Sequence, residues 1–138
     1  MRALTMLLLA AAPALAQAPT VPLTAGMHRI RAEVAADFTT RARGLMYRES
    51  MPDNAGMLFI FDEADKHCMW MKNTLIPLAV AFLDERGAII NIAEMAPKTE
   101  NSHCAARPAR YALEMNKGWF AARGVKPGAV IGGLERLR

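Results

Sequence analysis

Short apolar segments separated by turn residues recur along this chain, and they constrain its fold more than any other feature. The expected strands lie at residues 28–34, 56–61, 68–71, 78–83, 88–93, 110–115 and 129–134. Proline, glycine, asparagine and aspartate, which favour turns, lie between several of these segments. Many short strands with few helices are typical of a sandwich or a barrel. The sequence therefore predicts a mainly-β fold, a compact β-sandwich or barrel-like domain with one or two short helices.

Local signals support individual elements of this fold. Apolar and charged residues alternate from His28 to Val34, which is the period of a half-buried strand. Asp84–Gly87 provides turn residues between two apolar segments, so a hairpin with a positive φ at its glycine is expected there. Asp37 precedes a short segment that ends at Gly44, and a second such segment covers Lys117–Arg123. Both segments are expected to be short helices.

The first 16 residues have the pattern of a cleavable secretory signal. Arg2 precedes an apolar run from Ala3 to Ala14, and Ala14–Leu15–Ala16 forms an A-x-A cleavage site. The run is shorter than the roughly 20 apolar residues of a spanning helix, and no cysteine follows it to carry a lipid. We expect a signal peptide at 1–16 and an exported, periplasmic protein with no membrane anchor after cleavage. The alternative is an uncleaved N-terminal anchor.

The remaining chain has the size of one domain, because removal of 16 of the 138 residues leaves 122. Residues 17–27 contain two prolines and no charge, which predicts a linker or disordered lead-in before a single mainly-β domain at 28–138. Loss of Arg2 leaves 16 of the 17 basic residues against 13 acidic ones, and they are spread along the chain. We therefore expect no nucleic-acid partner, and a monomer.

Four motifs identify a family resemblance. They are Arg43–Met46, Gly56–Phe59, Trp70–Thr74 followed by Ile76–Leu78, and Leu113–Glu114 followed by Gly118. In this order and spacing they resemble the domain of unknown function family 192, also called uncharacterised protein family 0127, over roughly Val34 to Gly133. The resemblance implies a compact, mainly-β, often exported domain with no agreed catalytic residues. The family commonly has an acidic residue where this chain has Ala79, which puts any function of that carboxylate in doubt.

Two His–Cys dipeptides contain both cysteines of the chain. They are His67–Cys68 and His103–Cys104. In an exported protein two cysteines most simply form a disulfide, here between Cys68 and Cys104. A bridge across the 35 intervening residues would stabilise the fold by about 3.5 to 4 kcal/mol on the chain-entropy model. One alternative is a copper site, because thiolate and imidazole bind Cu(I). Its ligands would be His67, Cys68, His103 and Cys104. Another is catalysis by a free cysteine with a histidine as its base.

Six polar or aromatic residues within the apolar motifs are candidate ligand-binding residues. They are Arg43, Trp70, Lys72, Asn73, Thr74 and Glu114. A Trp beside a Lys and an Asn on a sheet face can stack on a ring and hydrogen-bond its substituents. The structural interpretation is an ion pair between Arg43 and Glu114, because buried charges are rare unless they are paired. A hydrolase that pairs Glu114 with Asp62 or Asp84 is a further alternative.

These observations predict a class of function rather than a reaction. We expect an exported, non-catalytic binding or accessory module for a small molecule, a glycan or a peptide, with no cofactor. The first alternative is a periplasmic copper-binding or trafficking protein. The second is a hydrolase that uses paired carboxylates or a Cys/His pair. The chain has no G-x-S-x-G, H-E-x-x-H, P-loop or C-x-x-C motif, so no named reaction follows from its residues.

Overall fold

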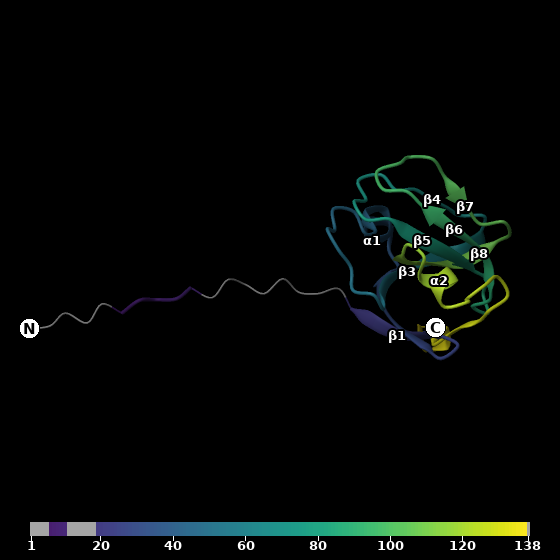
Figure 1. Cartoon of the computed structure of the whole chain (residues 1–138), viewed down its shortest axis with the longest axis horizontal. Coiled ribbons are helices and arrows are strands. Elements are labelled where there is room, and N and C mark those ends of the chain that lie inside the picture. The colour runs from purple at the N-terminus through teal and green to yellow at the C-terminus, as the bar shows by residue number, and fades with distance from the viewer. Residues whose placement is uncertain (1–5, 11–18, 138) are drawn as a thin grey trace, which may run out of the picture.

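A computed structural model of the protein describes residues 6–10 and 19–137. The strands in these residues are β1 (Thr20–Ala25), β2 (His28–Ala35), β3 (Ala55–Asp65), β4 (Cys68–Met69), β5 (Leu78–Leu83), β6 (Ile89–Met95), β7 (His103–Cys104), β8 (Ala109–Asn116) and β9 (Ile131–Gly132). The helices are α1 (Phe38–Arg43), α2 (Trp119–Ala122) and the 3-10 helix η1 (Leu134–Leu137). Seven strands form one sheet in the order β6-β5-β8-β3-β2-β1-β9, while β4 and β7 form a separate ladder. The large sheet curls into a half-barrel (Figure 1).

Strand β8 lies in the interior of the sheet, where it pairs antiparallel with both β3 and β5. Strands β2 and β3 run parallel, and the chain passes between them through α1 and the loop that follows it. At the ends of the curled sheet, Ala88 forms a bridge with Val130, and the Ile89 amide donates to the Ala129 carbonyl at 2.8 Å. These contacts link the start of β6 to the segment before β9, and so they half-close the barrel.

The predicted mainly-β fold is confirmed, together with most of its local signals. The alternating segment at His28 forms β2. Helix α1 begins after Asp37, whose carboxylate accepts a hydrogen bond from the Thr40 amide at 2.8 Å, and it ends at Gly44 with φ 50°. Gly87 adopts φ 84° in the hairpin that joins β5 to β6. These elements are predictable because each depends on contacts between residues close in sequence.

The N-terminal part of the domain differs from the prediction. Residues 17–27 are not a linker throughout, because Thr20–Ala25 forms β1, which pairs with β2 and β9. Leu23 and Ala25 are buried there. Pro22 argues against a strand at this position in the sequence, because proline cannot donate to a strand ladder and is uncommon in strands. The sheet therefore begins at Thr20 rather than at His28.

Most of the predicted signal peptide lies outside the described residues, which include only residues 6–10 of it. These residues form neither helix nor strand. Among the described residues, no helix is long and apolar enough to span a membrane. Signal cleavage and export therefore stay predictions.

Two predicted strands are shorter than expected. The segment 68–71 forms a strand only at Cys68–Met69, because the chain leaves the strand at Trp70 and turns at Lys72 and Asn73. The segment 129–134 forms β9 only at Ile131–Gly132, and η1 follows it. The loop predicted at 96–108 contains the short strand β7, which pairs with β4. Each of these short strands pairs with a strand far away in sequence, β4 with β7 and β9 with β1, and no local pattern indicates that partner.

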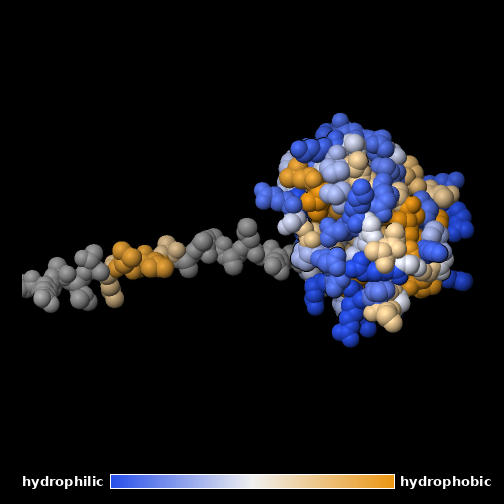
Figure 2. Space-filling model, viewed as in Figure 1, coloured by the Kyte–Doolittle hydropathy of each residue, from blue (hydrophilic) through white to orange (hydrophobic). Residues whose placement is uncertain are grey.

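The core consists of two hydrophobic clusters on opposite faces of the sheet. Side chains alternate along a strand, so Leu113 of β8 belongs to one cluster and Ala112 to the other. The first, here called the helix-covered face, packs against Trp119 of α2 and Leu134 of η1. The second, the loop-covered face, packs against residues from loops: Leu45, Met71 and Ile76. The outer surface seen in Figure 2 is mostly hydrophilic, with small apolar patches.

Candidate functional site

Three loops cover the loop-covered face, and backbone hydrogen bonds join them. The loops are residues 44–54, 70–77 and 96–102. The Tyr47 amide donates to the Asn73 carbonyl at 2.9 Å, and the Lys98 amide donates to the Thr74 carbonyl at 2.9 Å. The middle loop is therefore bonded to each of the other two. Residues 70–75 of this middle loop contribute to the lining of two hollows.

The larger hollow, here called the apolar groove, is open and has a volume of about 250 Å³. Its apolar lining comes from α1, β3, β4 and the first loop: Phe38, Leu45, Met46, Phe59, Phe61 and Met69. Phe38 is 80% exposed, and Trp70, which also lines the groove, is 47% exposed. Large exposed aromatic side chains around a hollow are typical of a binding site, because a ligand that covers them removes apolar surface from water.

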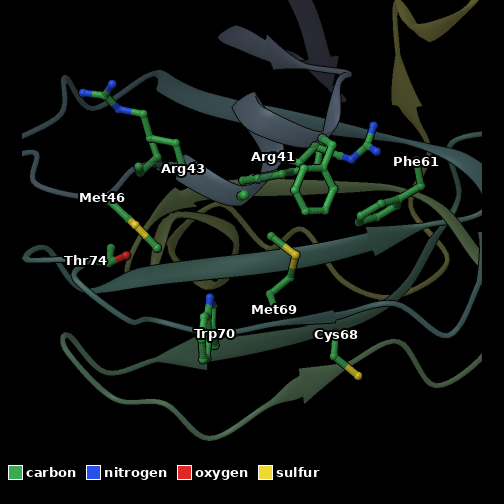
Figure 3. A pocket seen from close by; sticks show the side chains of 13 residues that line it. Arg41, Arg43, Met46, Phe61, Cys68, Met69, Trp70 and Thr74 are labelled. Carbon is green, nitrogen blue, oxygen red and sulfur yellow. The ribbon is translucent and has the colours of Figure 1, made fainter.

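Besides the arginines of α1, the polar side-chain groups that line the apolar groove are those of Trp70 and Thr74. In Figure 3 the indole nitrogen of Trp70 and the hydroxyl of Thr74 point toward the space beside Met46 and Met69. No described residue accepts a hydrogen bond from the Trp70 N–H. Thr74 is buried and its hydroxyl donates to the Lys72 carbonyl at 3.2 Å, so its oxygen is still able to accept. Apart from the arginines, these side chains thus offer one donor and one acceptor to a ligand.

Two arginines of α1 line the groove and play different parts. Arg41 donates to the Ile60 carbonyl at 3.0 Å and lies 3.5 Å from the Asp62 carboxylate, so it ties α1 to β3. Arg43 extends away from the groove at its rim (Figure 3). Within the described part of the chain, Arg43 has no ion-pair or hydrogen-bond partner. Its guanidinium is therefore available to a ligand at the rim.

A disulfide between Cys68 and Cys104 lies beside the groove, as the sequence predicts. The two cysteines face each other in the ladder of β4 and β7, next to Met69 and Trp70. The bond therefore holds the segment that forms one wall of the groove. Because the sulfurs are bonded to each other, neither is a free thiolate for copper or for nucleophilic attack.

The two candidate histidines do not converge with the cysteines on a common point. His67 stacks on Phe61 with the ring centroids 3.8 Å apart. His103 lies 3.4 Å from the Asn101 side chain. The described residues contain no group of three or more His, Cys, Asp or Glu side chains placed to hold a metal ion. The alternatives that use these histidines thus gain no support from the geometry.

The smaller hollow, here called the polar hollow, has a volume of about 230 Å³. Its lining comes from all three loops: Tyr47, Lys72, Asn73, Leu75, Lys98 and Glu100. Trp70 and Thr74 line the apolar groove while Lys72 and Asn73 line the polar hollow, so the predicted cluster is divided between two hollows. The Trp70 and Lys72 side chains still meet, because the Lys72 ammonium lies 5.3 Å from the centroid of the Trp70 ring. These residues lie in a loop, and the prediction that they share a sheet face is wrong.

Glu114 lines neither hollow, and the expected ion pair with Arg43 is wrong. Glu114 lies on β8 opposite Met57 and Val80, so its side chain belongs to the loop-covered face, where it is buried. No described residue forms an ion pair or a hydrogen bond with its carboxyl group. Burial raises the pKa of Glu114 to about 8, so this carboxyl is mostly neutral at pH 7.

The other two candidate acids lie far from Glu114. Asp62 is five residues along β3 from Met57, the partner of Glu114, which is about 16 Å at the rise of a strand. Asp84 is four residues beyond Val80, the other partner, which is about 13 Å. The paired carboxylates of a hydrolase are therefore not assembled around Glu114.

The model of the family DUF192, described as Uncharacterized ACR, COG1430, matches residues 21–133. The chain belongs to this family. The resemblance seen in the sequence motifs is thus confirmed, and the match begins further toward the N-terminus than Val34, so that it includes most of β1. No curated protein matches the chain.

Two solved bacterial structures are similar to this DUF192 protein. One is from Sinorhizobium meliloti 1021, and a role as a transcription regulator has been suggested for it. It is 35% identical with a TM-score of 0.81, over 87% of this chain and 98% of that one. The other, from Novosphingobium aromaticivorans DSM 12444, is a protein of unknown function. It is 36% identical with a TM-score of 0.81, over 90% of this chain and 94% of that one.

Sequence reasoning missed several residues of the two hollows. Phe38 and Phe61 are apolar residues of a helix and a strand, and neither position distinguishes a groove wall from ordinary packing. Tyr47, Lys98 and Glu100 belong to loops that no motif singles out. Their convergence depends on how the loops fold over the sheet, and residue types alone do not report it.

Proposed function

We propose that this protein is an exported, non-catalytic binding module whose apolar groove takes a small molecule with an apolar body and a hydrogen-bond acceptor. The groove wall carries the proposal, since apolar side chains surround an indole N–H with no partner in the described chain. The apolar body would cover Phe38 and Trp70, and the acceptor would bond to the Trp70 N–H.

The rim of the groove favours a ligand with negative charge at one end. Arg43 lies there with no ion-pair partner among the described residues, whereas Arg41 is already bonded to β3. A guanidinium binds carboxylates and related anions through charge-assisted hydrogen bonds. An aromatic or aliphatic anion therefore suits this groove better than a neutral hydrocarbon.

A small molecule fits the groove better than a glycan or a peptide. A glycan presents many hydroxyl groups, and each needs a polar partner when it is buried. Apart from the arginines of α1, the described side chains of the groove offer only the Trp70 N–H and the Thr74 oxygen. A peptide usually binds along a free sheet edge or an extended groove, whereas a volume of about 250 Å³ suits one compact ligand.

Export is part of this proposal, and two observations support it. The N-terminus has the pattern of a secretory signal, and disulfides persist mainly in oxidising compartments. The role suggested for the Sinorhizobium protein is not adopted for this chain. Arg48 and Arg123 form ion pairs with Glu33 and Asp53, which neutralise two of the positive charges that a nucleic-acid surface would use.

Binding of 8-anilinonaphthalene-1-sulfonate, an aromatic anion, tests the proposal by fluorescence. We expect one site per chain. Phe38→Ala and Trp70→Ala should each weaken binding about tenfold, because burial of a large apolar side chain contributes about 1.5 to 3 kcal/mol. Met27→Ala is the matched control, since it removes an 88% exposed apolar side chain from the turn between β1 and β2.

The control decides between a specific groove and general surface hydrophobicity. Binding to the Met27→Ala variant is expected to stay within about twofold of the wild type. An equal loss in all three variants, or no loss in Phe38→Ala, would contradict the proposal. Binding of a trisaccharide or a tripeptide that depends on Trp70, without binding of the aromatic anion, would replace the small molecule with that ligand class.

A further inference from the structure

The polar hollow is lined by every non-glycine residue with a positive φ in the described part of the chain. These are Tyr47 at 66°, Asn73 at 55° and Lys98 at 57°. A left-handed backbone is unfavourable for residues with a Cβ, above all for a bulky one such as tyrosine. Three separate loops therefore adopt an unfavourable conformation at one place. Such residues persist only where their surroundings fix them, and they gather at ligand sites.

Backbone hydrogen bonds fix these residues and leave their side chains unused. The Tyr47 amide bonds to the Asn73 carbonyl, and the Lys98 amide bonds to the Thr74 carbonyl. By contrast, the Tyr47 hydroxyl, the Asn73 amide group and the Lys98 ammonium have no hydrogen-bond or ion-pair partner among the described residues. The loops thus hold three donors at one hollow, and no group of the described chain accepts from them.

The charges of the hollow favour an anion. Two ammonium groups, on Lys72 and Lys98, line it together with one carboxylate, on Glu100. The Lys72 ammonium lies 4.0 Å from the Glu100 carboxylate, and both side chains are about half exposed or more. This ion pair is loose, and exposed pairs of this kind are weak. An incoming carboxylate is therefore able to take the place of Glu100 beside Lys72.

We propose that the polar hollow is a second binding site, for a small organic carboxylate. Lys72 and Lys98 supply the charge, and Tyr47 and Asn73 donate to the carboxylate oxygens. Leu75, together with the Tyr47 ring, contacts the hydrocarbon part of the ligand. Inorganic phosphate fits less well, because the net charge of the lining is only one positive, no arginine lines the hollow and part of the lining is apolar.

No described residue lines both hollows, but the two sites are neighbours, because the Lys72 ammonium of the polar hollow lies 5.3 Å from the centroid of the Trp70 ring in the apolar groove. Phe38 and Lys98 take no part in that contact, so variants at these two positions test the two proposals separately. Phe38→Ala should leave carboxylate binding in the polar hollow unchanged, and Lys98→Gln should leave binding of the aromatic anion in the apolar groove unchanged. Either variant with both activities impaired would indicate a general loss of folding, which a far-ultraviolet circular dichroism spectrum detects.

Titration of sodium propionate into the isotopically labelled protein, followed by amide chemical shifts at constant ionic strength, tests the proposal. We expect saturable shifts at Tyr47, Asn73 and Lys98, with a dissociation constant on the order of millimolar for so small a ligand. Lys98→Gln should weaken binding about fivefold, and Glu100→Gln should strengthen it about threefold because the competing carboxylate is gone. Lys126→Gln removes the same charge away from the hollow and should change binding less than about twofold.

Three outcomes would overturn the proposal. Lys98→Gln and Lys126→Gln with equal effects would mean that the protein responds only to overall charge. Glu100→Gln with no gain in affinity would mean that the ligand does not replace this carboxylate. Equal or tighter binding of inorganic phosphate with the same shifts would mean that the hollow does not select a carboxylate. Propanol, which has the same carbon chain without the charge, is expected to produce no saturable shifts at these amides.

Discussion

The two faces of the sheet are covered in different ways. The helix-covered face packs against Trp119 and Phe120 of α2, which directly follows β8, and against Leu134 near the C-terminus. The loop-covered face packs against three loops, which line the polar hollow and, together with α1, β3 and β4, the apolar groove. Loops are less regular than helices, so they leave hollows and present polar groups. The comparison indicates that one face mainly stabilises the fold and the other carries the candidate sites.

The faces also differ in the polar groups that they bury. The two buried polar or charged residues of the described chain are Thr74 and Glu114. Thr74 belongs to the covering loops, and Glu114 faces the same side from β8. The helix-covered face contains one buried polar atom without a partner, the Trp119 indole nitrogen. Each face therefore buries a polar group without a hydrogen-bond partner in the described chain, but only the group on the loop-covered face, the Glu114 carboxyl, titrates.

The largest expected effect concerns Glu114. Burial raises its pKa from 4.5 to about 8, so between these values the folded protein retains a proton that the unfolded chain releases. Stability is therefore complete at low pH and falls as the pH rises toward 8, by at most about 5 kcal/mol. Glu114→Gln, which stays neutral, should remove most of this dependence. Urea unfolding at a series of pH values from about 5 to 9 measures how the free energy of unfolding depends on pH. The same dependence in the wild type and in Glu114→Gln would contradict burial of Glu114 as the cause.

Removal of the disulfide should lower the free energy of unfolding by nearly as much. The variant with both Cys68→Ser and Cys104→Ser is expected to lose about 4 kcal/mol of unfolding free energy, since the bond closes a long loop in the unfolded chain. Because the bond holds the wall that carries Trp70, the variant should also bind the aromatic anion more weakly. Urea unfolding and fluorescence titration measure the two effects. A stable variant with unchanged binding would show that the wall does not depend on the bond.

A matched pair of leucines compares the two faces directly. Leu113 on the helix-covered face is 0% exposed, and Leu45 on the loop-covered face is 2% exposed. We expect Leu113→Ala to cost about 3 to 4 kcal/mol and Leu45→Ala about 2, because a loop can collapse into the cavity while a central strand cannot. Unfolding in urea measures both. A larger loss for Leu45→Ala would reverse the assignment of stability to the helix-covered face.

The smallest expected effect concerns the left-handed backbone at Asn73. Asn73→Gly should change the unfolding free energy by less than about 0.5 kcal/mol, while Asn73→Ala should cost about 1 kcal/mol, because alanine tolerates a positive φ poorly. The difference between the two variants measures the strain at this position. If both variants have the same stability, the conformation of the loop changes easily and the polar hollow is not preformed.

Much of the fold could be predicted from the sequence, and the failures have a common cause. The hairpin at Gly87 and the ends of α1 depend on contacts within a few residues, so their signals are local. Strand β1 is not predicted because Pro22 disfavours a strand, and only pairing with β2 and β9 overcomes that local preference. Strand β7 is not predicted because its two residues form a strand only through pairing with β4, which is distant in sequence.

The candidate site was predicted less well than the fold. The motif from Trp70 to Thr74 was identified, but its division between two hollows depends on loops that are distant in sequence. Arg43 and Glu114 looked like an ion pair, yet the register of β8 places Glu114 between Met57 and Val80 and away from α1. A sequence reports that a charge occurs among apolar residues, but it does not report what faces that charge.

By itself, the sequence determined the mainly-β class, the family and the one pairing open to its two cysteines, because periodicity, motif order and residue type carry this information. Only the tertiary structure decided which residues line the two hollows and that Glu114 is buried without a partner. Those features arise where the three loops fold over the sheet, and the backbone bonds from Tyr47 and Lys98 that hold them form only once the sheet is in place.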